Sequence, residues 1–577
     1  MQREVQEHPR ERPEPPFAPT VPNLLHWVAE QYGDRVAHWR ADDQLSFKGL
    51  EARSALYARG LLAMGVTKGA RVAVMLPNGP DFVAAFMAAA RIGALVAPLS
   101  TLYQAPELRW VLSHADIHTL IIADSYLRHD YLARLEEALP TLKGQTPGRL
   151  VLPEAPYLRQ ILVWGEGART WSQPGPQTLR AAAEANPQFD SGFLARLEQN
   201  VTPADLLCII HTSGSTAEPK GVLHTHGAMI RHSYQKAFHF WPLGEGDVCI
   251  GVRPFFWVAG LAASVFQCLL GGRPIYTPEN DSGAAAVRLI EAHGVNAVCS
   301  AETYMAVLRN DPDLAAAGYE IVRESNDCGA FARRTPQGLK FMTEQRKDWT
   351  PVHPHPHQVP RSYGMTETVS AHTSMPSGQL LPDDKLECCG RQMAGVRVRI
   401  VDQITREELP ANQVGEVEVS GYNLMQGINK RERESVFTAD GWYATGDLCR
   451  RDEDGYLFFS NRIGEMIKVK GANVAPLEVE HALNNLPSVA RSAVLGLYPE
   501  AQDSLLCAAV EIRGGQVFDP EAIREALKTQ LSSFKVPRRV FALAPEEFPL
   551  TGSGKIVKSA LIPMLEARLK AENVGAP

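Results

Sequence analysis

Short apolar runs alternate with longer helical patterns through the first half of the chain. Residues 72–76, VAVML, are typical of a buried strand, and residues 81–92 carry small and apolar side chains on one helical face. Two further apolar runs, at 94–98 and 119–123, lie on either side of a helical pattern at 107–114. Strands that alternate with helices in this order form parallel sheets whose faces the helices cover. The alternation therefore predicts an α/β N-terminal portion.

The pattern changes after about residue 390. Residues 396–401 and 415–419 alternate strictly between apolar and polar side chains, which indicates half-exposed strands. A helical pattern at 478–486 and apolar runs at 493–495 and 506–512 indicate a smaller α+β unit.

Candidate boundaries follow from these changes of pattern. The N-terminus is charged, rich in proline and without the apolar segment of a secretory signal, so we predict a disordered arm over residues 1–20. Between residues 143 and 199 the periodic patterns give way to Pro, Gly and Gln, which indicates surface loops. A boundary near 461–465 separates a predicted N-terminal domain, 21–462, from a C-terminal domain, 463–577.

Composition excludes several classes of protein. Of the 577 residues, 45% are hydrophobic and 21% are charged, which is typical of a soluble globular protein. A formal net charge of -7 argues against nucleic acid as a partner. The nine cysteines show neither a disulfide framework nor a zinc spacing, and a reducing, cytoplasmic location is the simplest interpretation.

One apolar segment resembles a membrane span. Residues 254–270 read PFFWVAGLAASVFQCLL, but they fall short of the roughly 20 residues that a span needs. They also contain Gln267 and lie between Arg253 and Arg273. We predict a buried helix after a turn and no integral membrane segment.

A loop rich in small residues follows an apolar run at 206–210. It reads TSGSTAEPKG at 212–221 and offers backbone N–H groups, hydroxyls and one lysine, which together suit a polyphosphate. It is not a Walker A loop, because Lys220 lies between Pro219 and Gly221. Taken alone, the segment could equally be a flexible Ser/Gly loop without a ligand.

Four further motifs accompany this loop in a fixed order. They are YGMTE at 363–367, DGWYATGD at 440–447, DGY at 454–456 leading through KVKG at 468–471 to PLEVE at 476–480, and PLTGSGK at 549–555. With these motifs the chain resembles the adenylate-forming superfamily of acyl-CoA synthetases, aryl-CoA ligases, luciferases and peptide-synthetase adenylation domains. Ala217 stands where that superfamily usually has glycine.

The resemblance implies a fold and a reaction. The fold is α/β, with a large N-terminal domain of two helix-covered sheets plus a distorted β-barrel, and a small mobile α+β C-terminal domain. The reaction is an acid–CoA ligation in which ATP converts a carboxylate into acyl-AMP and the acyl group then passes to the thiol of coenzyme A. The partners would be a small-molecule carboxylic acid, ATP, Mg²⁺ and coenzyme A, and a homodimer is compatible with the sequence.

The resemblance also assigns roles to residues of the motifs. Tyr363 would stack on adenine opposite Gly329 and Ala330, Asp447 would bind both ribose hydroxyls, and Glu367 and Thr216 would hold the metal. The catalytic residues would be Lys555, Glu367 and Thr366. The full predicted ATP/AMP-binding set is Thr212, Ser213, Gly214, Ser215, Thr216, Lys220, Gly329, Ala330, Tyr363, Gly364, Met365, Asp447 and Arg462.

The C-terminal motifs concern the step between the half-reactions. Lys555 would bridge the carboxylate and the α-phosphate during adenylation, and Lys470 and Gly471 would line the channel for the thiol arm of coenzyme A. The hinge position falls on Gly464, where Asp or Lys is usual. Glycine still permits rotation there.

The acyl pocket is less readable from the sequence. We assign four residues to this pocket: Trp257, Val258, Gly260 and Glu302. The alternative for Trp257 is an aromatic residue of the core, and the alternative for Glu302 is a surface or salt-bridged acid. Because Trp257 lies in an apolar run, a medium-chain, branched, alicyclic or aromatic acid is favoured over acetate.

Two rival functions and two decoys complete the set of interpretations. An enzyme that loads a carrier protein's pantetheine arm would share the adenylation step, and a nucleotide-binding protein without catalysis would explain Ala217 and Gly464.

The histidines of HPHPH at 353–357 could suggest a metal site, but no fourth ligand accompanies them. The Asp503-Ser504-Leu505 segment lacks the preceding Leu-Gly-Gly of a carrier protein, so we dismiss it.

Overall fold

The computed structural model describes most of the chain between residues 11 and 574. The stretches outside the description are 213–218, 241–243, 245, 281, 300–304, 306–307, 326–327, 337, 343–361, 376–380, 382, 386–387, 463–466, 470–471, 475, 498–504, 550–555 and 557, besides both ends.

The described chain forms two compact units. Unit 1 consists of Met1–Thr101, Leu112–Ile210 and Gly221–Asn461, and unit 2 consists of Leu102–Val111, His211–Lys220 and Arg462–Pro577. The second unit therefore contains the whole of the predicted C-terminal domain together with two short segments from the first half of the chain.

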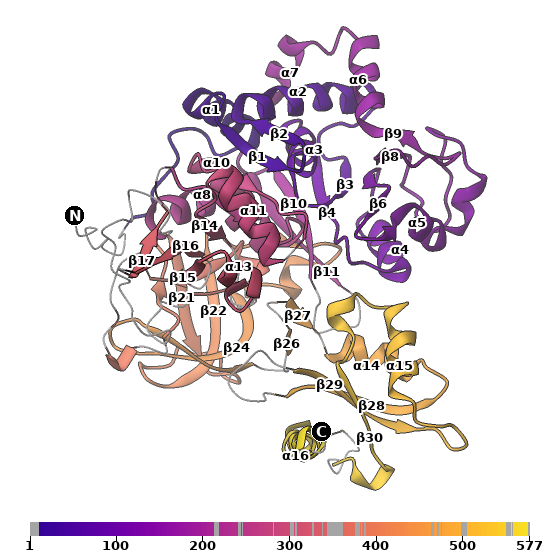
Figure 1. Ribbon diagram of the computed structural model, residues 1–577, viewed down its shortest axis with the longest axis vertical. Coiled ribbons are helices and arrows are strands. Elements are labelled where there is room, and N and C mark those ends of the chain that lie inside the picture. The colour runs from indigo at the N-terminus through magenta and orange to yellow at the C-terminus, as the bar shows by residue number, and fades with distance from the viewer. Residues whose placement is uncertain are drawn as a thin grey trace. The chain divides into compact units, whose positions relative to one another are not determined.

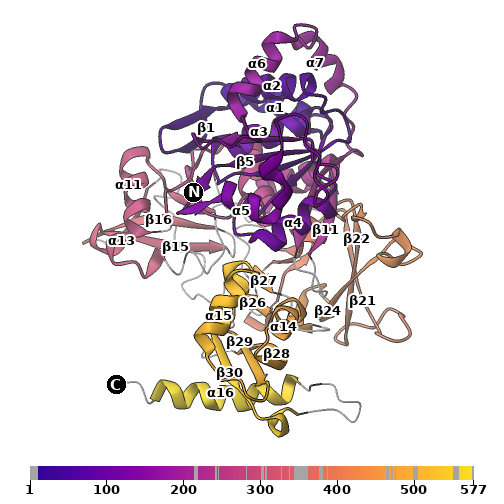
Figure 2. The ribbon, with the colours of Figure 1, turned by 90° about the vertical axis from the view of Figure 1, so that its right-hand side faces the viewer.

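One large sheet, here called the β3 sheet, carries the predicted alternation. Its strand order is β23-β11-β10-β4-β3-β5-β8-β9, and the pairs from β10 to β9 are parallel. The expected strands at 72–76, 94–98 and 119–123 are confirmed as β3 and β4 (Figure 1) and β5 (Figure 2). The bounds are β3 Arg71–Met75, β4 Leu95–Pro98, β5 Thr119–Ala123, β8 Gln160–Trp164, β9 Gln173–Pro174, β10 Leu206–Thr212, β11 Lys220–Thr225 and β23 Gly427–Ile428.

A second large sheet, here called the β12 sheet, is mixed. Its order is β15-β16-β14-β12-β13-β1-β2, with β17 beside β16. The inner strands β14, β12, β13 and β1 are parallel to one another, whereas β2, β15, β16 and β17 pair antiparallel. The bounds are β1 Val36–Arg40, β2 Asp43–Ser46, β12 Cys249–Gly251, β13 Ile275–Tyr276, β14 Ala297–Cys299, β15 Tyr319–Ser325, β16 Cys328–Thr335 and β17 Gly338–Phe341.

Helices cover these sheets as the sequence predicts. Helix α3 begins after Gly79, whose φ of 146° favours glycine, and has Pro80 in its first turn, where a missing N–H costs nothing. All but one of its residues are buried. The helices of this part are α1 Val21–Tyr32, α2 Phe47–Ala63, α3 Pro80–Arg91, α4 Ala105–His114, α5 Tyr131–Ala138, α6 Gly175–Ala185, α7 Ser191–Glu198, α8 His226–Gln235, α11 Gly283–His293 and α13 Pro312–Ala316.

The prediction of surface loops over residues 143–199 is wrong. This stretch contains β8, whose last four residues are buried, and the helices α6 and α7. Helix α6 packs against α2 (Figure 1). Leu179 and Ala183 lie one turn apart on α6 and are buried, so packing against α2 stabilises the helix.

Two antiparallel sheets stand where the distorted barrel is predicted. They have the orders β21-β22-β24-β25 and β18-β19-β20, and side chains from both belong to one apolar core. Strand β22 is buried over six consecutive residues, so the expectation that it is half exposed is wrong there. The bounds are β18 Tyr363–Gly364, β19 Ala371–Ser374, β20 Arg391–Gln392, β21 Val396–Val401, β22 Val414–Gly421, β24 Tyr443–Arg451 and β25 Leu457–Arg462.

Unit 2 is an α+β unit with a helix layer on each face of its sheet. Strands β28, β29 and β30 form the sheet, with α14 and α15 on one side and α16 on the other (Figure 2). Val494 and Leu506 face α14 and α15, whereas their neighbours Leu495 and Cys507 face α16, as the two-residue period of a strand requires. The bounds are β26 Ile467–Val469, β27 Ala472–Val474, α14 Pro476–Asn484, β28 Val489–Leu497, β29 Leu505–Ile512, α15 Pro520–Lys528, β30 Arg539–Ala542 and α16 Lys558–Val574.

Part of the predicted N-terminal arm has a defined place on unit 1. The guanidinium of Arg12 lies 4.4 Å from the centroid of the Tyr422 ring, and Glu14 Oε2 accepts a hydrogen bond from Arg231 Nε at 3.0 Å. Thr20 is buried and caps α1. Residues 11–20 therefore differ from the expectation of a disordered arm.

The apolar segment 254–270 forms the predicted buried helix. It consists of α9 Val258–Gly260, a π-helical segment η3 Leu261–Phe266, and α10 Gln267–Leu270. Across the described parts of the chain, none of the helices combines the length and the apolar character that crossing a membrane requires.

Candidate functional site

The YGMTE motif forms a tight strand-to-helix corner. Tyr363 and Gly364 make the short strand β18, and Thr366–Thr368 form a turn of 3-10 helix, η6. A Cβ atom on Gly364 would lie 2.1 Å from the carbonyl oxygen of Ser370, so only glycine fits where the two backbone segments meet. The corner therefore fixes the backbone between Tyr363 and Glu367.

A close approach at Gly364 leads to a prediction about stability. The Gly364→Ala protein is expected to lose about 2 kcal/mol or more of unfolding free energy, because the obstructing atoms belong to the backbone and cannot rotate away. Gly427→Ala is the matched control, since no atom lies within 4 Å of its added Cβ. Urea unfolding of both variants checks the difference, and equal midpoints would contradict it.

Tyr363 and Asp447 come together from distant parts of unit 1. The Tyr363 hydroxyl donates a hydrogen bond to Asp447 Oδ2 at 2.6 Å. Burial, with the Asp447 charge as a further cause, raises the pKa of Tyr363 well above its usual value, so the phenol stays a donor. The structure thus joins the residue predicted for adenine to the residue predicted for ribose.

The turn before Asp447 explains its motif. Gly446 has a φ of 74°, a conformation that favours glycine, and its N–H donates to Glu416 Oε1 at 3.0 Å. The Asp447 N–H donates to the Thr445 hydroxyl at 3.1 Å. These contacts fix the backbone at the middle of β24, and the Tyr363 hydrogen bond holds the carboxylate of Asp447, a residue that is 4% exposed.

Glu367 is a second nearly buried carboxylate of this region. Its side chain accepts a hydrogen bond from the Tyr443 hydroxyl at 3.2 Å, and its carbonyl oxygen accepts one from the Met425 N–H at 2.8 Å. A carboxylate oxygen is the ligand type that Mg²⁺ prefers. Tyr443 belongs to the DGWYATGD motif, but the sequence alone gave no sign of its contact with Glu367.

Buried histidines lie behind the motif, and sequence reasoning missed them. The His372 ring makes an edge contact with Tyr363 at 4.4 Å between centroids, and its Nδ1 lies 3.2 Å from the Thr368 hydroxyl. Burial lowers the pKa of His372 and His232 to about 3 and that of His224 to about 4. These histidines are therefore neutral at physiological pH, and no spacing in the sequence marks them.

The remaining predicted ATP/AMP-binding residues divide into described and undescribed positions. Thr212 ends β10 and Lys220 begins β11, on either side of the Ser/Gly loop. Gly329 and Ala330 lie on β16, opposite Val298 and Ala297 of β14. The positions outside the described residues are Ser213, Gly214, Ser215, Thr216, Glu302, Gly464, Lys470, Gly471 and Lys555, the side chain of Arg462, and the decoys at 353–357 and 503–504.

The described part of the predicted acyl pocket is the start of the buried helix. Trp257 precedes α9, is partly buried and contacts Phe256 at 5.5 Å between ring centroids. Val258 follows it, and Gly260 is buried where a Cβ atom would lie 1.9 Å from the Pro254 carbonyl oxygen. A helix can therefore begin here only because residue 260 has no side chain.

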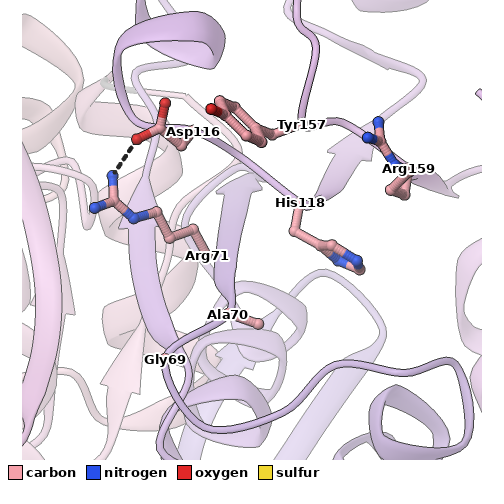
Figure 3. Close-up of a pocket in the computed structure, with 7 residues that line it drawn as sticks. All are labelled: Gly69, Ala70, Arg71, Asp116, His118, Tyr157 and Arg159. Carbon is pink, nitrogen blue, oxygen red and sulfur yellow. Dashed lines mark hydrogen bonds and ion pairs between the residues drawn. The ribbon is translucent and has the colours of Figure 1, made fainter. Parts of the chain in front are cut away.

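A surface hollow of about 320 Å³ lies elsewhere, at the edge where β3, β5 and β8 begin. Figure 3 shows its charged wall, in which Arg71 pairs with Asp116 at 3.2 Å. Ligands of open parallel sheets bind at the opposite, carboxyl edge. None of the motif residues lines the hollow, whose lining is Gly69, Ala70, Arg71, Asp116, His118, Tyr157 and Arg159.

Comparison with known families matches both parts of the chain. The family described as AMP-binding enzyme matches residues 25–428, and the AMP-binding enzyme C-terminal domain matches residues 478–555.

Characterised relatives align over nearly the full length. A medium-chain acyl-CoA ligase, mitochondrial, of Danio rerio is 26% identical, with 95% of this chain and 89% of the relative covered. A sulfoacetate–CoA ligase of Cupriavidus necator is 28% identical, with 96% and 99% covered. A Rhodococcus jostii ligase named for CoA and a methyl-dioxo-octahydro-indenyl propanoyl group is 27% identical, with 94% and 98% covered.

Solved structures share the fold. Amide bond synthetase McbA from Marinactinospora thermotolerans superposes with a TM-score of 0.70 at 23% identity, covering 94% of this chain and 99% of its own. A double mutant of o-succinylbenzoate CoA synthetase from Bacillus subtilis gives a TM-score of 0.67 at 21% identity, with 93% and 98% covered. The mixed α/β architecture, with a large N-terminal and a smaller C-terminal part, is thereby confirmed.

Proposed function

The chain belongs to the AMP-binding enzyme family and is an adenylate-forming CoA ligase, and we propose that it activates a medium-chain, branched, alicyclic or aromatic carboxylic acid. One observation carries the assignment of the site. Two nearly buried carboxylates, Asp447 and Glu367, are each held by a tyrosine hydroxyl within unit 1.

The proposed reaction has two steps. In the first, a carboxylate oxygen of the acid attacks the α-phosphorus of ATP, and the bond to pyrophosphate breaks. In the second, the sulfur of coenzyme A, having lost its proton, attacks the carbonyl carbon, and AMP leaves with the electron pair of the broken bond. The first step brings anions together, so the site must supply positive charge and fixed donors.

Asp447 and Tyr363 would bind the nucleoside. A carboxylate accepts two hydrogen bonds side by side, which suits a pair of ribose hydroxyls. The hydrogen bond from Tyr363 fixes the Asp447 side chain beforehand, so less orientational freedom is lost on binding. The adenine ring would lie against Gly329 and Ala330, as the resemblance implies. The phosphates would contact Lys220, Thr212 and Thr366.

Glu367 would hold the magnesium ion that accompanies ATP. Its carboxylate is a hard oxygen donor, and the Tyr443 hydroxyl orients it, so the residue fits such an ion. When bound, the ion neutralises charge on the phosphate oxygens. Lys555 would neutralise the carboxylate and the α-phosphate during the first step. For the second step, Gly464 would act as the hinge, and the channel for coenzyme A would be lined by Lys470 and Gly471.

The apolar environment of Trp257 supports the substrate class. Phe256 is buried beside it, and the helix that follows is buried throughout η3 and α10. Burial of apolar area contributes about 25 cal/mol per Å², so an extended hydrocarbon or ring gains more from such a wall than acetate does.

The direct test is product formation from a panel of acids. With ATP, Mg²⁺ and coenzyme A present, we expect kcat/KM for octanoate, cyclohexanecarboxylate or benzoate to exceed that for acetate by about 100-fold. This ratio corresponds to the free energy gained when about three or four CH₂ groups are buried. Mass spectrometry of AMP and acyl-CoA gives the measurement. Reactions that lack ATP or coenzyme A are the controls.

Each result of the panel has a defined meaning. Faster turnover of acetate would contradict the substrate class and leave the ligase chemistry intact. Acyl-AMP without acyl-CoA would indicate a carrier-protein acceptor in place of free coenzyme A.

A further inference from the structure

Three cysteines far apart in the sequence meet inside unit 1. The Sγ atoms of Cys249, Cys268 and Cys299 all lie within 4.8 Å of one another, and each residue is at most 1% exposed. Cys268 is hydrogen-bonded to both of the others. Of the described residues, this is the group whose side chains could together hold a metal ion.

The β12 sheet and the helix above it create this arrangement. Cys249 begins β12 and Cys299 ends β14, and the parallel register pairs Cys249 with Ala297 and Gly251 with Cys299. Cys249 and Cys299 are therefore on the same face of adjacent strands. Cys268 lies on α10, the last turn of the buried helix, and completes a triangle of sulfur atoms.

A buried positive charge accompanies the three thiols. Arg273 is 6% exposed; its backbone N–H donates to the Cys268 carbonyl oxygen at 2.9 Å, and its guanidinium donates to the carbonyl oxygens of Gly244 and Ala237, each at 3.4 Å. The Arg273 charge is close enough to act electrostatically on the Cys268 thiol. Thiolates formed here would therefore lie near a compensating cation, without which buried negative charge is costly.

We propose that Cys249, Cys268 and Cys299 form a binding site for a soft, three-coordinate metal ion, with Cu(I) as its best-fitting occupant. Thiolates select soft ions. Structural zinc needs four ligands, and the described residues place three donors in this group. On binding, the sulfur atoms bond to the ion and their protons pass to solvent, with no change of oxidation state.

The metal-site proposal does not rest on the proposed ligase function. None of its three residues belongs to the motifs around Tyr363, Glu367 and Asp447. The test can therefore succeed or fail without reference to catalysis.

The experiment titrates Cu(I) into the reduced full-length protein under anaerobic conditions, against a chromophoric Cu(I) chelator. We expect one tightly held ion per chain, and X-ray absorption should count three sulfur neighbours. Cys268→Ala is expected to weaken binding more than about 100-fold, beyond the loss caused by removing a supporting group around a metal. Cys208→Ala is the matched control, since Cys208 is also fully buried but lies on β10 of the other sheet.

Other results would overturn the proposal. They are the absence of tight binding, equal affinity in Cys268→Ala and the wild type, and displacement of Cu(I) by an equal concentration of Zn²⁺. A count of two sulfur atoms would also overturn it and would direct attention to the adjacent pair Cys388 and Cys389. The sulfur count uses the wild-type protein, so the test stands even if Cys268→Ala fails to fold.

Discussion

The Glu367→Gln enzyme is expected to form acyl-AMP about 100- to 1,000-fold more slowly than the wild type. Glutamine keeps the shape of the side chain and can still accept the hydrogen bond from Tyr443, so the fold around η6 should survive. What disappears is a negative charge that is 7% exposed and therefore weakly screened. We propose that this charge holds the metal, whose contribution to transition-state stabilisation amounts to several kcal/mol.

ATP–pyrophosphate exchange measured across a range of Mg²⁺ concentrations checks this expectation. A lost metal ligand should raise the Mg²⁺ concentration needed for half-maximal exchange, whereas general damage to the site would lower the rate at every concentration. Exchange within threefold of the wild type, at the same Mg²⁺ requirement, would remove Glu367 from the proposed metal site.

Two further variants calibrate the result. Tyr443→Phe removes only the hydroxyl that orients Glu367, and we expect a loss of about tenfold, the value of one hydrogen bond to a charged group. Glu408→Gln makes the same chemical change at an exposed ion pair with Arg451 and is expected to leave the exchange rate within twofold.

The protein is expected to lose stability steeply as the pH falls below 6.5. Burial lowers the pKa of His38, His226, His232 and His372 to about 3 and that of His224 to about 4. In the unfolded chain each of these histidines titrates near 6.5. The unfolded state therefore binds more protons than the native state between about pH 6.5 and pH 3, and acid favours unfolding.

The magnitude is large because the five effects act together. Each histidine costs about 1.4 kcal/mol of unfolding free energy per pH unit once the pH is well below 6.5. Together the five histidines lower the unfolding free energy by about 7 kcal/mol per pH unit, which is comparable with the whole stability of a typical domain. We expect unfolding to be complete before the folded-state pKa values are reached.

Urea unfolding at pH 7.5, 6.5 and 5.5 measures the dependence, and His38→Phe isolates one contribution. His38 is 1% exposed and lies edge-on to Phe255 at 6.1 Å, so phenylalanine fits a similar space. Below pH 6.5, the unfolding free energy of the His38→Phe protein should fall by about 1.4 kcal/mol less per pH unit than that of the wild type. His293→Phe makes the same chemical change at a partly exposed ring beside Trp39 and Tyr276 and is the matched control. A wild-type midpoint that stays constant from pH 7.5 to 5.5 would contradict the expectation.

The sequence alone predicted the features that depend on neighbouring residues. The strands β3, β4 and β5 and the helices α3 and α4 follow from runs and periods within a dozen residues, and the structure confirms them. The buried helix at 258–270 was recognised from its short length and its flanking arginines. Local patterns failed between 143 and 199, where contact with α2 stabilises α6.

The motifs determined the family for a related reason. A backbone contact at Gly364 leaves no room for a side chain, the φ of Gly446 favours glycine, and Asp447 and Glu367 are carboxylates that we propose for the chemistry, so each motif records a local constraint. The family and its reaction follow from the order of these motifs. The substrate does not, because the residues that we propose for the acyl pocket, Trp257, Val258, Gly260 and Glu302, belong to none of the motifs.

Tertiary structure alone decided which of these residues meet. The bond between Tyr363 and Asp447 joins positions 84 residues apart, and that between Glu367 and Tyr443 joins positions 76 apart. The low pKa values of the buried histidines and the meeting of Cys249, Cys268 and Cys299 depend likewise on packing between distant segments. Burial and long-range contacts arise only when the sheets and helices assemble. The composition and residue spacing of a single segment therefore do not predict these contacts or the pKa shifts that burial causes.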